Sequence, residues 1–118
     1  MKGISMKKIA LVLCGLLVLS ATAFAHPPSD IKISFDPETK LLSAIIEHRV
    51  SSPQSHYIKK IDIKLNGKEI QTLVFKKQDS NADQTFAVPV PEAQKGDTLS
   101  VEGYCNLSGK LEKKIEVQ

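Results

Sequence analysis

The stretch that decides the fold is HYIKKIDIKLNGKEIQTLVF, residues 56–75. Apolar side chains alternate with polar ones on both sides of Asn66-Gly67, and side chains with a period of two lie on one face of a β-strand. Asn-Gly between two alternating runs is the strongest short signal of a two-residue hairpin turn, because both positions require a positive φ. The stretch therefore predicts a β-hairpin that turns at residues 66–67.

Alternating runs of the same kind recur on both sides of this hairpin. They occupy residues 31–35, 42–46, 86–90, 99–105 and 111–117. Polar residues 36–40 form a turn between the first two runs, and Pro89 and Pro91 mark the third run as an edge strand or as the end of a strand. No segment has a sustained helical period. We therefore predict an all-β fold, a single immunoglobulin-like β-sandwich of about seven strands.

The first 25 residues have the three parts of a secretory signal peptide. They contain a positive n-region (Lys2, Lys7 and Lys8), an apolar run at residues 9–19 and a small-x-small cleavage site at residues 23–25. The apolar run is short for a transmembrane helix. We expect residues 1–25 to be removed and residues 26–118 to form one exported domain, periplasmic or secreted, that begins at His26.

Removal of that segment changes both the charge and the sulfur content. The chain has 16 Lys and Arg and 13 Asp and Glu; three lysines leave with the signal peptide and every acid stays, so 13 of each sign remain. A chain without net charge gives no electrostatic reason to expect nucleic acid or a membrane as a partner. Cys105 becomes the sole cysteine, so no intramolecular disulfide can form in an oxidising compartment.

The soft or borderline metal ligands of residues 26–118 are three histidines and one cysteine, since both methionines also leave with the signal peptide. His48 ends one predicted strand and His56 opens the next, so their imidazoles can converge at one end of the sandwich. Cys105 ends a strand just before a turn. Each residue also has an ordinary structural role: Cys105 as a small buried hydrophobic residue, His48 as a hydrogen-bonded strand end, and His26 as a mobile terminus.

Two motifs carry a resemblance to a known family. YCNLSG at residues 104–109, together with SHYIKKIDIKLNGK at residues 55–68, resembles the iron domain of the superoxide reductase (desulfoferrodoxin, neelaredoxin) family. That family is an immunoglobulin-like sandwich that binds one ferrous ion through four histidines and one axial cysteine thiolate. The resemblance implies an iron-binding oxidoreductase that reduces superoxide, with an electron-donor protein as partner and assembly into homo-oligomers.

The family's ligands map onto this chain only in part. Cys105 matches the thiolate, which donates electron density to the iron, and His56 matches the second upstream histidine. Ser108 stands where the family has its downstream histidine, and Val50 stands where it has the histidine of its His-Pro pair. We expect His48, and His26 from the new N-terminus, to complete the depleted metal shell. Superoxide turnover does not follow from the motif alone.

Two alternatives stay open. The α-amine and the imidazole of His26 would together form a chelate that favours copper, so a copper or zinc carrier is the second hypothesis. A metal-free β-sandwich that acts as a binding module is the third. Hydrolase chemistry has no support, because the sequence lacks a Gly-x-Ser-x-Gly motif, a phosphate-binding loop and a paired carboxylate arrangement.

Overall fold

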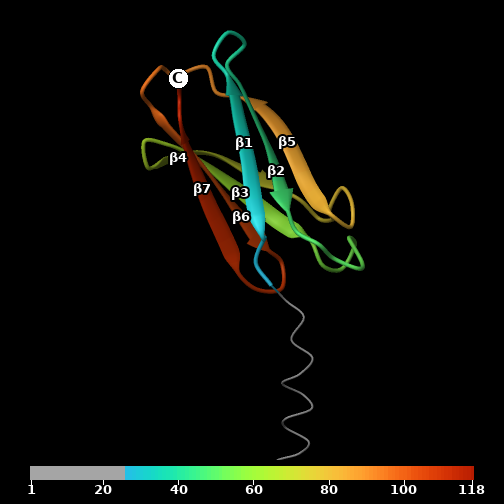
Figure 1. Ribbon diagram of the computed structural model, residues 1–118. Coiled ribbons are helices and arrows are strands. Elements are labelled where there is room, and N and C mark those ends of the chain that lie inside the picture. Colours follow the sequence, from blue (N-terminus) through green and yellow to red (C-terminus); the bar gives the residue numbers. More distant parts are fainter. Residues whose placement is uncertain (1–25) are drawn as a thin grey trace, which may run out of the picture.

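A computed structural model describes residues 26–118, so the predicted signal peptide at residues 1–25 lies outside the described residues. The described chain forms seven β-strands and no α-helix, which confirms the all-β prediction. Within these residues no helix is long and apolar enough to cross a membrane. The strands are β1 (Asp30–Asp36), β2 (Leu41–Glu47), β3 (Ile58–Leu65), β4 (Lys68–Val74), β5 (Asp83–Pro89), β6 (Thr98–Cys105) and β7 (Lys110–Glu116) (Figure 1).

The strands form two antiparallel sheets that pack face to face (Figure 1). One sheet has the order β1-β2-β5 and the other has the order β4-β3-β6-β7. Strands β1 and β7, one from each sheet, lie side by side along one side of the sandwich. The order is that of an immunoglobulin-like sandwich in which the fourth strand pairs with the third instead of with the fifth. The predicted fold is therefore confirmed.

The central hairpin has the predicted turn. Asn66 and Gly67 have φ values of 53° and 84°, and Leu65 pairs with Lys68 across them. Two consecutive positive φ values are the mark of a two-residue hairpin turn whose twist matches that of the flanking strands. The side chain of Asn66 also accepts a hydrogen bond from the N–H of Thr98 at 2.9 Å, so the turn is tied to the start of β6.

The core lies between the sheets and is built from one face of each strand. Alternate side chains of β2, β3 and β6 point inward and are fully buried, among them Leu42, Ile46, Ile61, Ile63, Leu99 and Val101. The outer face of the larger sheet is charged instead. Lys64 lies between Glu102 and Glu112, and the hydroxyl of Tyr104 donates to Glu102 at 2.8 Å, which raises the pKa of Tyr104 to about 12.

Candidate metal site

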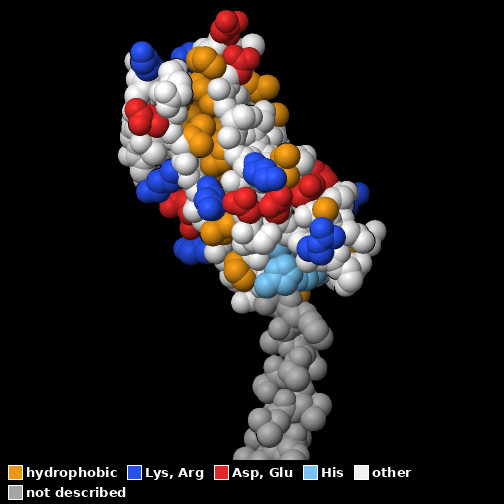
Figure 2. Space-filling model, viewed as in Figure 1, with side chains coloured by type: hydrophobic (Ala, Val, Ile, Leu, Met, Phe, Trp, Pro, Cys, Tyr) orange, Lys and Arg blue, Asp and Glu red, His pale blue; other side chains and the backbone are white. Residues whose placement is uncertain are grey.

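Three segments bring the histidines together at one end of the sandwich. His26 precedes β1, His48 follows β2, and His56 lies in the loop before β3. Their ring centroids are 4.7 to 5.0 Å apart, and a ligand atom of each ring lies within 4.8 Å of the others. Figure 2 shows the histidine side chains as a patch at the end of the molecule opposite the C-terminus. We call this group the histidine cluster.

The strand pairing explains why these segments meet. Strands β1 and β2 are antiparallel and Asp30 pairs with Glu47, so the residues before β1 lie beside those after β2. His56 does not open the next strand as predicted. It lies in a turn in which its N–H donates to the carbonyl of Ser52 at 2.9 Å, and β3 begins only at Ile58.

His48 is fully buried, and both of its ring nitrogens face oxygen atoms. Nδ1 lies 2.8 Å from Oε1 of Gln78, and Nε2 lies 3.2 Å from the carbonyl oxygen of His26. A neutral imidazole has one N–H donor and one nitrogen with a free lone pair. One nitrogen of His48 therefore has no hydrogen-bond donor opposite it.

His26 has the same arrangement at a more exposed position. Its Nδ1 lies 3.0 Å from the carbonyl oxygen of Pro27, and its Nε2 lies 3.0 Å from that of Arg49. Only one of these nitrogens carries a proton in the neutral ring, so the lone pair of the other faces an acceptor. A cation bound to that nitrogen would remove the mismatch.

His56 provides the clearest sign that the cluster accepts a ligand. Its Nε2 is the one buried side-chain nitrogen or oxygen of residues 26–118 with no polar atom within hydrogen-bond distance. Burial lowers the pKa of His56 below its ordinary value of 6.5, and positive charge on His48 and His26 lowers it further. A neutral imidazole with a free lone pair is the form that binds a metal ion. The donor set therefore fits a transition-metal ion.

Cys105 does not belong to the histidine cluster. It is a free thiol at the end of β6, it is 3% exposed, and it pairs with Ile58 of β3. Its Sγ accepts a hydrogen bond from the N–H of Leu107 at 3.4 Å. The structure thus groups three of the four predicted ligands and leaves the fourth outside the group, and the role of all four as ligands stays a prediction.

Asn106 links the Cys105 turn to the His56 loop. Its N–H donates to the carbonyl of Tyr57 at 2.9 Å, and its side-chain oxygen accepts from the N–H of Tyr57 at 2.8 Å. The side-chain NH₂ also donates to the carbonyl of Ser55 at 3.0 Å. These three bonds hold the residues on either side of His56, so the YCNLSG motif has a structural role next to the histidine cluster. Ser108, which replaces the family's downstream histidine, is exposed.

Gln78 is a residue of the site that the sequence did not reveal. It is 3% exposed, and its side chain bonds to the ring and to the carbonyl of His48. In the sequence it lies within a polar stretch, residues 76–84, that resembles a solvated loop. No local pattern distinguishes a buried glutamine in such a stretch, because its partner is 30 residues away.

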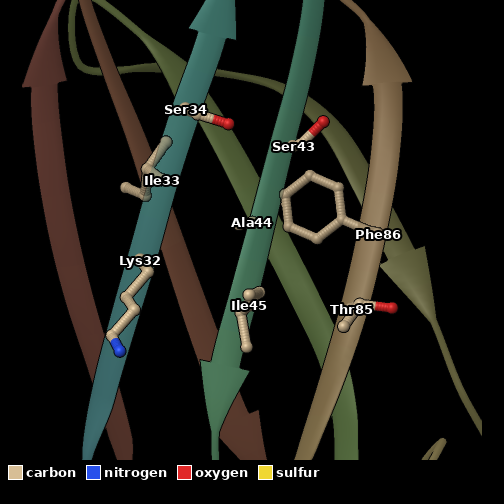
Figure 3. A pocket seen from close by; sticks show the side chains of 8 residues that line it. All are labelled: Lys32, Ile33, Ser34, Ser43, Ala44, Ile45, Thr85 and Phe86. Carbon is tan, nitrogen blue, oxygen red and sulfur yellow. The ribbon is translucent and has the colours of Figure 1, made fainter.

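A hollow along the β1-β2-β5 sheet lies outside the histidine cluster (Figure 3). Figure 3 shows its lining side chains on three adjacent strands, with Phe86 of β5 beside Ala44 of β2. Its polar groups are the amine of Lys32 and the hydroxyls of Ser34, Ser43 and Thr85. This hollow has no imidazole, thiol or carboxylate, so the candidate metal site is the histidine cluster.

The lowered pKa of His56 predicts a pH dependence of the metal-free protein. Between the folded pKa and 6.5, the unfolded chain binds more protons than the folded chain, so the free energy of unfolding decreases as the pH falls. The contribution of His56 to the free energy of unfolding is complete above pH 6.5 and decreases progressively as the pH falls below that value. Urea unfolding in a chelator at several pH values measures this loss. A His56→Leu variant should show a flatter profile, and an equally steep profile would contradict the assignment.

Compared with protein-family models and with curated proteins, the chain matches none of them. The class of protein is therefore inferred from the fold and from the chemistry of the histidine cluster. Residues 26–118 form a β-sandwich with a cluster of three histidines at one end.

Proposed function

We propose that the protein is an exported metal-binding protein that holds one transition-metal ion on His26, His48 and His56. The observation that carries the proposal is the convergence of all three histidines of the chain, with a buried Nε2 of His56 that has no partner. Unpaired buried polar atoms are rare in folded proteins because each costs free energy. A metal ion would use the lone pairs for which the described residues provide no donor.

The donor atoms of the histidine cluster limit which metal ions it would bind. Neutral imidazole nitrogens suit zinc, copper and ferrous iron, whereas calcium and magnesium prefer oxygen ligands. No carboxylate belongs to the histidine cluster. A nitrogen-only set favours copper or zinc, and cleavage before His26 would add its α-amine as a further nitrogen ligand. We therefore place a copper or zinc carrier first.

A superoxide reductase-like iron protein is the second candidate. The bonds of Asn106 to Tyr57 and Ser55 favour it, because they hold the end of β6, where Cys105 lies, against the loop of His56. Iron bound with a thiolate would supply the electron that reduces superoxide, and an external donor protein would replace that electron. Cys105 would then be a ligand, and its burial would keep the thiol from other oxidants.

Elemental analysis and reconstitution test the proposal. The protein is purified anaerobically with His26 as its first residue, and the bound metal is measured in wild type and in Cys105→Ser. We expect about one equivalent of copper or zinc per chain, retained in the variant. Iron that is lost in Cys105→Ser would favour the superoxide reductase-like candidate. No metal, even after addition of each ion, would overturn both and leave a metal-free binding module.

A further inference from the structure

We propose that Gln78 is a positioning residue for metal binding: it fixes His48 in the tautomer whose Nε2 carries the lone pair for the metal. The inference rests on the proposed function, because it assigns the atom through which one of the three ligands acts. Gln78 and His48 are 3% and 0% exposed, so water does not replace their contact. The proposal follows from the hydrogen bonds of the Gln78 amide.

The orientation of that amide is determined by two carbonyl groups. Its nitrogen lies 2.7 Å from the carbonyl oxygen of His48 and 2.8 Å from that of Ser80. An amide NH₂ has two donors, and here both have an acceptor. The reverse orientation would place the amide oxygen against two carbonyl oxygens and lose both bonds. The amide oxygen therefore faces Nδ1 of His48, at 2.8 Å.

The orientation of the amide decides the tautomer of His48. An amide oxygen only accepts, so Nδ1 of His48 must carry the proton and donate. In the neutral ring Nε2 is then left with the lone pair, and it lies 3.2 Å from the carbonyl oxygen of His26. Both of these atoms are acceptors, so no hydrogen bond stabilises their approach. A metal ion on Nε2 would relieve this mismatch.

Gln78 also connects the two loops that carry His48 and His56. Its N–H donates to the carbonyl of Pro53 at 3.0 Å, in the loop that leads to His56, while its side chain binds His48. A residue that accepts the second N–H of a metal-ligating histidine usually fixes the ring for binding. Loss of such a partner lowers metal affinity by about 10- to 100-fold.

The test compares three variants of the full mature chain. Gln78→Leu removes both the acceptor and the donors. Gln78→Glu keeps an oxygen acceptor for Nδ1 but loses the two donor bonds to the carbonyls of His48 and Ser80, so it separates the effect of the acceptor from that of the donors. Gln84→Leu is the matched control, because Gln84 is also buried, at 2% exposure, but its side chain bonds to Asp79 and Thr85 and to no histidine. Urea unfolding in a chelator measures the stability loss that each substitution causes by itself.

Two readouts separate the inference from the proposed function. Long-range ¹H–¹⁵N NMR of the metal-free protein at alkaline pH reports the tautomer of His48, and competition with a chromogenic chelator reports zinc affinity. We expect the Nδ1–H tautomer in wild type, in Gln84→Leu and in Gln78→Glu, and a mixture in Gln78→Leu. Zinc affinity should fall about 10- to 100-fold in Gln78→Leu, fall less in Gln78→Glu, which keeps the acceptor for Nδ1, and stay within about threefold in Gln84→Leu.

Each remaining outcome contradicts either the role of Gln78 or the proposed function. Equal zinc affinity in wild type and Gln78→Leu, or an Nε2–H tautomer in wild type, overturns the role of Gln78 while the proposed function stands. If wild type binds no transition-metal ion, the proposed function fails and the positioning role fails with it; the NMR result then shows only a structural bond. If Gln78→Leu does not fold, the decision passes to Gln78→Glu. Its failure to bind zinc while folded and in the Nδ1–H tautomer would contradict the inference.

Discussion

Replacement of His56 by leucine is expected to weaken zinc or copper binding by more than about 100-fold and to leave the metal-free protein at least as stable as wild type. Loss of a direct ligand should exceed the 10- to 100-fold effect of losing an outer partner. Stability should not fall, because the substitution removes the buried Nε2 that has no partner. Relief of an unsatisfied buried polar atom is worth about 1–3 kcal/mol.

His48→Leu provides the contrast. His48 also contributes an imidazole to the cluster, but its Nδ1 is hydrogen-bonded to the buried side chain of Gln78. Its loss should abolish metal binding and also destabilise the metal-free protein by about 1–3 kcal/mol, because the oxygen of Gln78 loses its donor. The two variants should therefore agree in metal affinity and differ in stability.

Urea unfolding in a chelator and competition for zinc measure the two quantities on the same preparations. A His56→Leu protein that still binds zinc would contradict the assignment of His56 as a ligand, and one that is less stable than wild type would contradict the expected effect on stability. Reduced stability together with lost binding would mean that His56 packs as well as ligates. Higher stability with lost binding is the signature expected of a residue kept for its ligand, since functional sites commonly reduce stability.

Periodicity alone predicted most of the fold. Side chains that alternate across strands such as β3 and β6 must bury one face, and the Asn66-Gly67 turn fixes the register between β3 and β4. The sequence was less informative where a polar residue points inward. Strand β5 begins at Asp83 and not near residue 86, because Gln84 is buried and bonds to Asp79 and Thr85.

The sequence predicted the three histidines of the candidate site and only part of their arrangement. Strand order places His48 and His56 at one end, since each flanks the same loop, and antiparallel pairing of β1 with β2 brings His26 to them. The separation of Cys105 from the cluster and the contact with Gln78 depend on long-range side-chain packing. A motif of adjacent residues contains no information about such contacts.

Replacement of Gly109 by alanine is expected to reduce both stability and metal affinity, whereas alanine at Gly96 reduces stability alone. Both glycines have a left-handed backbone, with φ values of 87° and 91°. An L-residue in that conformation costs roughly 1–2 kcal/mol at either site. The surroundings differ: a Cβ at Gly96 would meet nothing within 4 Å, but one at Gly109 would lie 2.9 Å from Cβ of Pro27.

The added contact at Gly109 affects the cluster because Pro27 is bonded directly to His26. The backbone nitrogen of Pro27 would lie 3.0 Å from the new Cβ, so the main chain itself must shift. Metal sites require their ligands within about 0.5 Å of the productive geometry. We expect Gly109→Ala to bind zinc at least about tenfold more weakly than Gly96→Ala at a similar stability loss from the backbone. Equal zinc affinity in the two variants would show that the contact with Pro27 does not position His26, and metal binding would then depend on His48 and His56.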